Sequence, residues 1–229
     1  MSDAEHLKLW RQASAHASGG TSGSYIKEAV IAVLEDLPTP SSLFDYGAGK
    51  GELVAMLRGL LPGTRLVATD LMPRPDALDA SIAWIEADLN APIAHEPVDV
   101  VICSEVIEHL ENPRQTMRNL AALLRPGGML ILTTPNQESL RSLLALVTAG
   151  HHAAFLGRSY PAHITALLRM DISRIAAECG FAPGTFRYTD RGRIPKWTRH
   201  TWQDVSGGLL KGRLFSDNLV FVAQKRAPG

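Results

Sequence analysis

Cysteine, net charge and long apolar runs are all scarce in this sequence. Cys103 and Cys179 are its two cysteines in 229 residues, and 23 lysines and arginines balance 23 acidic residues. Two isolated cysteines exclude a disulfide scaffold, and with no secretory leader recognisable we expect reduced thiols in a cytoplasmic protein. The charge balance gives no overall attraction to nucleic acid, which counts against such a partner, and no apolar run reaches the length of a membrane span.

What remains is an ordinary globular composition arranged in alternating strand and helix patterns. Hydrophobic residues make up 45% and charged residues 20%, and the length suits one large α/β domain. Alternating strand and helix segments with short links predict a doubly wound sheet. We divide the single domain into leading helices at 1–36, a core at 40–136, an insertion at 137–170, and a C-terminal helix and strands at 171–229.

A glycine-rich turn is the strongest local feature. Ser42 to Phe44 predict a short strand, and Glu52 to Leu61 repeat apolar residues at helical spacing. The turn between them contains Asp45, Gly47, Gly49 and Gly51. Missing side chains allow a ligand to approach the backbone, and a strand, glycine turn and helix N-terminus form a nucleotide-type site. The dinucleotide fingerprint has its third glycine where this chain has Glu52, which disfavours a nicotinamide dehydrogenase.

Three further apolar segments predict strands, and two of them end near an acidic residue. Arg65 to Asp70 is one, and Ile82 to Asn90, closing with Asp88, is the next. Pro97 to Cys103 is a near-continuous apolar run, which is typical of a central parallel strand buried on both faces. Asp70 can accept hydrogen bonds from the two hydroxyls of a ribose, or it can form the turn that follows its strand.

Several motifs between residues 40 and 136 belong together. They are the D-x-G-x-G-x-G turn at Asp45, V-I-E-H-L after Cys103, L-R-P-G-G-x-L-I-L leading into a strand at Met129 to Asn136, and the T-P-N end of that strand. Together they resemble the class I S-adenosylmethionine (AdoMet)-dependent methyltransferases, most of all the ubiquinone-pathway and glycan or natural-product branch. The resemblance implies a Rossmann-like, doubly wound seven-stranded sheet with an antiparallel last strand at Asn218 to Gln224, and a small helical cap inserted after strand five.

The same resemblance implies AdoMet as the cofactor and assigns residues to it. Asp70 would hold the ribose, Asp88 and Leu89 the adenine, and Glu105 the methionine end, with Asp45 near the amino group through water. Asp88 has an alternative role as a loop cap. The implied cofactor-binding residues are Asp45, Gly47, Ala48, Gly49, Gly51, Asp70, Leu71, Asp88, Leu89, Ser104 and Glu105.

An E-x-x-E-H segment follows the predicted fourth strand. In a helix, Glu105, Glu108 and His109 would share one face, which suits a divalent metal or an acid–base site. Among the resembled enzymes, ubiquinone-pathway methyltransferases carry a similar segment, and RNA 3′-terminal 2′-O-methyltransferases use it with a distant His to bind Mg²⁺. Alternatively, Glu105 fixes the cofactor loop, Glu108 is solvated and His109 packs near Pro113. We predict that no metal is bound.

The insertion from Gln137 to Met170 is where the resembled family places its substrate cap. It carries a Leu-rich helix at 140–147 and three polar residues in apolar surroundings, as a pocket lid requires, namely Arg158, Tyr160 and His163. His163 is our candidate base, and Glu105 and His109 are further catalytic candidates. The alternative for His163 is a structural role.

The segment from Thr189 to Arg213 interleaves basic and aromatic residues. Its members include Arg191, Arg193, Lys196, Trp197, Arg199, His200, Trp202 and Lys211. Such a pattern can hold a nucleic acid or a phosphorylated acceptor, but we favour a solvated loop with two buried tryptophans.

These observations predict an AdoMet-dependent methyltransferase that O-methylates a small acceptor, free or linked to lipid or glycan. One alternative is a metal-dependent methyltransferase of RNA 3′ ends, which the absence of net positive charge disfavours. A second is a non-catalytic AdoMet-binding protein, which the intact Asp45 and glycine turn disfavour. The sequence leaves the oligomeric state open.

Overall fold

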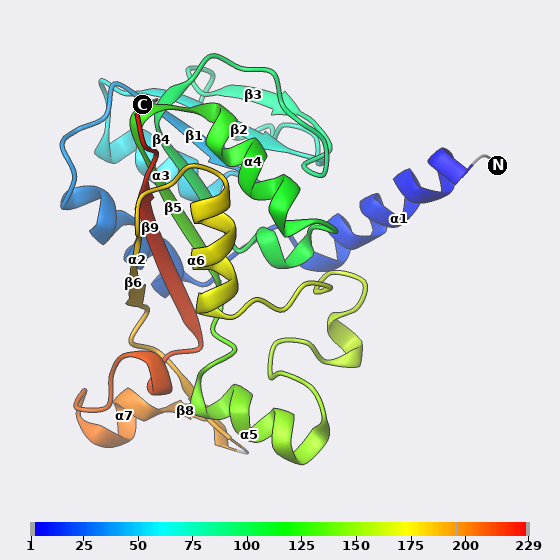
Figure 1. Cartoon of the computed structure of the whole chain (residues 1–229), viewed down its shortest axis with the longest axis vertical. Coiled ribbons are helices and arrows are strands. Elements are labelled where there is room, and N and C mark those ends of the chain that lie inside the picture. Colours follow the sequence, from blue (N-terminus) through cyan, green and yellow to red (C-terminus); the bar gives the residue numbers. More distant parts are fainter. Residues whose placement is uncertain (1–2, 196, 228–229) are drawn as a thin grey trace.

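The computed structural model describes residues 3–195 and 197–227, and its centre is a seven-stranded mixed sheet (Figure 1). The strand order is β3-β2-β1-β4-β5-β9-β6; the first five are parallel, and β9 is antiparallel to β5 and β6. The bounds are β1 Ser42–Tyr46, β2 Arg65–Asp70, β3 Ala83–Glu86, β4 Val98–Ser104, β5 Leu124–Pro135, β6 Thr185–Tyr188 and β9 Asn218–Gln224. The predicted sheet is confirmed, including its antiparallel last strand beside the fifth.

Helices cover both faces of the sheet, which is what makes it doubly wound. In Figure 1, α4 (Pro113–Leu123) and α6 (Arg169–Glu178) lie on one face, with α2 (Ser24–Glu35) and α3 (Glu52–Leu60) on the other. β4 shows the consequence, because its side chains alternate between two cores: Val101 and Cys103 pack toward α4, and Val100 and Ile102 toward α2 and α3. Burial on both sides explains the continuous apolar run in this strand.

The remaining elements lie at the carboxyl ends of the parallel strands. α1 (Asp3–Ser18) projects to one side of the sheet, and α5 (Leu140–Ala149) lies at the lower end in Figure 1 beside the hairpin of β7 and β8. The other bounds are η1 Ile107–His109, η2 Gly157–Ser159, β7 Arg193–Ile194, β8 Trp197–Thr201, α7 Trp202–Ser206 and η3 Arg213–Phe215. No helix in the described ranges combines the length and the apolar character that crossing a bilayer requires.

Several element ends differ from the sequence prediction. β1 continues through Asp45 to Tyr46, and β3 stops at Glu86, so Asp88 lies in the loop beyond the strand. The N-cap residue of α2 is Gly23, which contributes no side-chain hydrogen bond. The β7–β8 hairpin and α7 were not predicted. Lys196 and the side chain of Trp197 lie outside the described residues, so the prediction of two buried tryptophans is tested only at Trp202, which is half-buried.

Candidate active site

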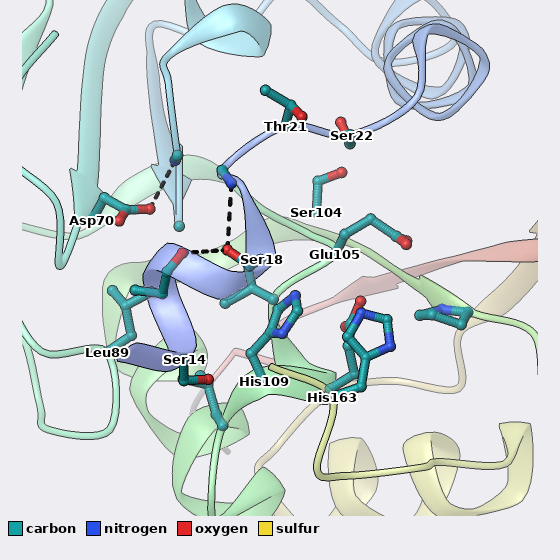
Figure 2. Close-up of a pocket in the computed structure, with 18 of the residues that line it drawn as sticks. Ser14, Ser18, Thr21, Ser22, Asp70, Leu89, Ser104, Glu105, His109 and His163 are labelled. Carbon is teal, nitrogen blue, oxygen red and sulfur yellow. Dashed lines mark hydrogen bonds between the residues drawn. The ribbon is translucent and has the colours of Figure 1, made fainter. Parts of the chain in front are cut away.

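A cavity of about 540 Å³ opens at the carboxyl ends of β1, β2 and β4. In an open α/β sheet this is where ligands bind. Its walls come from α1, residues 20–27, the ends of these strands, residues 154–164 of the insertion, and the start of β9. Figure 2 shows residues from several of these segments around it, including Asp70, Ser104, Glu105, His109 and His163.

The glycine turn is held tightly by the rest of the chain. Gly47 and Gly49 have φ of 83° and 55°, a left-handed backbone that favours glycine. A Cβ on Gly49 would lie 2.3 Å from the Gly20 carbonyl oxygen, and one on Gly47 would lie 2.3 Å from Cγ2 of Val106. The close approach that these glycines permit is therefore made by other protein segments, and their contact with a ligand stays a prediction.

Every backbone N–H of the turn has a partner within the protein. Those of Gly47 and Ala48 donate to the Thr69 carbonyl, and that of Gly49 donates to Asp70 Oδ2 at 2.7 Å, the contact dashed beside Asp70 in Figure 2. The N–H groups of Lys50 and Gly51 donate to the carbonyls of Gly20 and Ala48. A pyrophosphate needs free N–H groups at this point, so the turn does not suit a dinucleotide.

Asp45 presents a buried carboxylate with an unsatisfied atom. Its side chain is 1% exposed, lines the cavity, and has no hydrogen-bond partner for Oδ2. Burial, and then the negative charge of Asp70, raises the pKa of Asp45 to about 7. A buried orphaned acceptor in a cavity wall points to a donor on a ligand or a bridging water.

Asp70 and Asp88, the other two carboxylates predicted to bind the cofactor, differ in how many of their hydrogen-bond acceptor sites remain unused. Asp70 accepts from the N–H groups of Gly49 and Met72, at 2.7 and 2.9 Å, and keeps further lone pairs for a ligand. Asp88 instead forms an ion pair with Arg11 of α1 at 2.6 Å, and its other oxygen accepts from Asn90. The loop-cap role weighed for Asp88 is thus present, and its adenine role stays a prediction.

Glu105 does not share a helix face with Glu108 and His109, contrary to the sequence expectation. It lies before the short η1 turn, with φ of 55°, a strained conformation for a residue with a side chain. Its carboxyl accepts from Thr133 Oγ1 at 2.9 Å and from Asn218 Nδ2 at 2.6 Å. Burial, and then the charge of Glu108, raises the pKa of Glu105 well above its usual value.

Glu108, His109 and His163 form a cluster, each with a ligand atom within 4.8 Å of the others. Glu108 is 1% exposed, so the prediction of a solvated side chain is wrong. One of its oxygens accepts from Thr134 Oγ1 at 3.1 Å while the other has no partner, and burial raises its pKa to about 8. The three atoms could hold a metal ion, and the prediction that none is bound stays untested.

Both imidazoles of this cluster present an unprotonated nitrogen. His109 Nδ1 lies 2.8 Å from the Ala162 carbonyl, which can only accept, so Nδ1 carries the proton and Nε2 is unprotonated; the Glu105 backbone carbonyl also contacts this ring. His163 Nδ1 is buried without a partner, whereas the Ala154 backbone carbonyl accepts a hydrogen bond from the ring, which assigns the proton to Nε2 and leaves Nδ1 unprotonated. Burial lowers the pKa of His109, and burial and then the charge of His109 lower that of His163 to about 4. Both rings are therefore neutral at pH 7.

The insertion is fastened to the sheet at this point, which explains how His163 reaches the cavity. The N–H groups of Ile164 and Thr165 both donate to the Glu108 carbonyl at 3.0 Å, and Thr165 Oγ1 donates to the Leu110 carbonyl. Tyr160 also lines the cavity, as predicted for a lid residue, whereas Arg158 is exposed and does not.

Sequence reasoning missed residues on the far side of the cavity. Tyr25 lines it and donates to Asn218 Oδ1 at 3.3 Å. Arg141, Asp217 and Asn218 line it as well, and Arg193 joins them from the segment favoured as a solvated loop. The signals for them are weak: Tyr25 follows a glycine-rich break, and Asn218 is one polar residue opening an apolar strand.

A family model described as a methyltransferase domain matches residues 20–183. This chain belongs to that family. The match covers more than half of the sequence and spans the glycine turn, the E-x-x-E-H segment and His163. The protein is a class I methyltransferase whose cofactor is AdoMet.

Curated relatives of this methyltransferase include two named O-methyltransferases. A ubiquinone biosynthesis O-methyltransferase of Xanthomonas axonopodis pv. citri is 30% identical over 160 residues, 62% of this chain and 65% of the relative. A malonyl-[acyl-carrier protein] O-methyltransferase of Hahella chejuensis is 28% identical over 151 residues, 62% of this chain and 50% of the relative. The chain thus spans between 50% and 65% of the length of these two relatives.

Solved methyltransferases share the fold at low identity. The 1,6-didemethyltoxoflavin-N1-methyltransferase of Burkholderia thailandensis, with S-adenosylhomocysteine (SAH) bound, gives a TM-score of 0.62 at 16% identity, covering 99% of this chain and 92% of that one. A putative methyltransferase in complex with the Haloferax volcanii Trm112 activator gives 0.64 at 15% identity, covering 100% and 99%. The orphaned oxygen of Asp45 and the spare lone pairs of Asp70 fit the ammonium and ribose of AdoMet.

Proposed function

We propose that this methyltransferase methylates a hydroxyl oxygen of a small acceptor, either free or linked to a lipid or glycan. The observation that carries the proposal is the pair of unprotonated nitrogens, His109 Nε2 and His163 Nδ1, in one cavity wall. A hydroxyl must lose its proton on methylation, and a neutral imidazole is the usual acceptor. The names of the two O-methyltransferase relatives support the same chemistry.

The residues at the strand ends would bind AdoMet, which supplies a methyl group on a positively charged sulfur. Asp70 would accept from the ribose hydroxyls, and Leu71 lies beside it in the wall. Asp45 would compensate the ammonium group through water, and Ser104 and Glu105 would border the methionine end. Leu89 would pack against the adenine, with Asp88 held beside it by Arg11.

The insertion at 137–170 would act as the acceptor cap and supply the base. AdoMet would supply the methyl group to the acceptor oxygen, which would release its proton in the transfer. His163 Nδ1 accepts the proton, while Nδ1–H of His109, fixed on the Ala162 carbonyl, keeps its ring oriented toward the same space. Thr133 and Asn218 hold the Glu105 carboxyl in place at the edge of this site.

His163→Asn tests the proposal. Methyl transfer from labelled AdoMet would be measured on small phenols and alcohols and on their amine counterparts. We expect the substitution to lower turnover on hydroxyl acceptors by about 10²-fold or more while SAH affinity stays unchanged. His200→Asn, at an exposed histidine that is not among the residues lining the cavity, is the matched control. Wild-type turnover in the His163 variant would make this residue structural, and transfer to amines alone would overturn O-methylation.

A further inference from the structure

Two arginines meet at the end of the cavity nearest β9. Arg141 comes from the first turn of α5 and Arg193 from β7, and both line the cavity together with Asp217 and Asn218. The family match ends at residue 183, before Arg193 and the segment of β7 and β8. The proposed proton acceptor needs neither arginine, so their purpose is open.

Asp217 is the carboxylate that pairs with both of these arginines. Asp217 Oδ2 accepts from Arg141 Nη1 at 3.1 Å and from the Arg193 backbone N–H at 3.2 Å, with Arg193 Nε at 4.0 Å. One carboxylate therefore faces two guanidinium groups.

The other cations in the cavity wall are already matched by acids. Arg11 is shared between Asp88 and Glu111, and Lys27 pairs with Glu52. Among the charged lining residues of the described chain, Arg141 and Arg193 are the cations that share a single paired carboxylate, and the nearby Glu105 carboxyl is bound by Asn218 and has its pKa raised well above the usual value by burial.

Most N–H groups of these two guanidiniums have no acceptor among the residues that the structure describes. Arg141 makes a single side-chain hydrogen bond although its side chain is only 22% exposed, and the Arg193 guanidinium has only the 4.0 Å contact to Asp217. A guanidinium presents a planar fork of donors that matches a carboxylate or a phosphate. Arg141, whose side chain is mostly buried, and Arg193, whose side chain is 54% exposed, thus offer unused donors in the cavity wall that are suited to such a group on a ligand.

The position of the two arginines indicates that the anionic group they bind belongs to the methyl acceptor and not to AdoMet. Asn218, adjacent to Asp217, donates to Glu105 and accepts from Tyr25, so the arginines lie beyond these residues on the β9 side. Of the segments proposed to hold AdoMet, the ends of β1 and β2 and the loop after β3 lie on the other side of β4, and Ser104 and Glu105 at the end of β4 lie between them and the β9 side.

We propose that Arg141 and Arg193 form a subsite for an anionic group of the methyl acceptor, a carboxylate or a phosphate. This assignment rests on the proposed function, because it takes the β9 side of the cavity as the acceptor site. It makes the two arginines determinants of specificity and leaves the proton transfer at His163 unchanged.

Ligands that differ only in charge test the subsite. The full chain, saturated with SAH, would be titrated with benzoate, phenyl phosphate and neutral benzamide, while the backbone amides of Gly192, Arg193 and Asn218 are followed by NMR. We expect at least one anion to bind about tenfold more tightly than benzamide and to shift these amides. The tighter anion distinguishes carboxylate from phosphate. Arg193→Gln and Arg141→Gln should each remove this preference, and Arg199→Gln, at an exposed arginine of the same hairpin, should keep it.

Three results would overturn the subsite. They are an absence of shifts with both anions, equal affinity for benzamide, and an anion preference that persists in both arginine variants. A loss of SAH affinity in Arg193→Gln would also overturn it, by assigning the arginines to the cofactor carboxylate. None of these results bears on the His163 experiment, which uses uncharged acceptors, so the subsite can fail while O-methylation stands.

Discussion

His109 and His163 lie edge to face with ring centroids 4.8 Å apart, although one follows β4 and the other belongs to the insertion. Backbone hydrogen bonds from residues 164 and 165 to the Glu108 carbonyl hold the two rings together. The pair is partly buried and neutral, and both residues line the same cavity. This arrangement suits a proton acceptor, and with Glu108 it also matches the donor set of a metal site.

Removal of metal should leave the enzyme unchanged. Because the proposed mechanism uses the imidazoles as free bases, we expect EDTA to change neither SAH affinity by calorimetry nor turnover. A loss of turnover on chelation that Mg²⁺, Mn²⁺ or Zn²⁺ restores would instead identify Glu108, His109 and His163 as ligands. In that case Glu108→Gln should weaken the metal effect, which separates a protein-bound ion from one carried by the acceptor.

Glu108→Gln should make stability less dependent on pH. Burial raises the pKa of Glu108 to about 8, above the ordinary 4.5 expected in the unfolded chain. Between these two pH values the folded state retains a proton that the unfolded state has lost. The contribution of protonated Glu108 to stability is therefore fully present below about pH 4.5 and is lost as pH rises through about 8. We expect the free energy of unfolding of the wild type to fall by on the order of a few kcal/mol more than that of the variant between pH 5 and pH 9.

Urea unfolding at both pH values measures this difference. Asp45 and Glu105 also have raised pKa values, so the variant should keep a smaller fall in stability rather than none. An identical fall in both proteins would show that Glu108 is ionised in the folded state.

Asp70→Ala should weaken SAH binding by roughly 1.5–3 kcal/mol, since the loss of a charge-assisted hydrogen bond costs about that much. The substitution also removes the acceptor for the Gly49 N–H, so thermal unfolding should be measured beside calorimetry. Asp76→Ala, at an exposed aspartate outside the cavity, is the control. Unchanged SAH affinity in the Asp70 variant would exclude this carboxylate from the cofactor site.

Gly49→Ala and Gly59→Ala should have opposite effects on stability. A methyl group at Gly49 requires φ of 55° and meets the Gly20 carbonyl oxygen at 2.3 Å, so we expect about 1–3 kcal/mol of destabilisation and weaker SAH binding. Gly59 lies on an exposed face of α3 with nothing within 4 Å of a Cβ. Alanine there should stabilise the fold by about 0.5–1 kcal/mol. Urea unfolding of both variants measures the contrast, and equal effects would contradict it.

The sequence by itself determined the parts of this protein that depend on local pattern. Burial on both faces requires continuous apolar residues in β4, and the turn after β1 requires residues that accept positive φ, so both were readable in advance. The motifs between residues 40 and 136 then carried a family resemblance, and that resemblance implied the seven-stranded sheet, its antiparallel last strand and the AdoMet cofactor. Element ends were less certain, because a strand can continue past its last apolar residue while pairing lasts, as β1 does to Tyr46.

Only the tertiary structure decided which polar side chains meet in the cavity. Spacing placed Glu105 on a face with Glu108 and His109, but the chain turns at Glu105 because Thr133 and Asn218, from other strands, bind its carboxyl. The ion pair between Arg11 of α1 and Asp88 is likewise a contact between segments that are distant in the sequence. Such contacts join residues far apart in the chain, and no local periodicity encodes them, since they follow from how the helices and the insertion pack on the sheet.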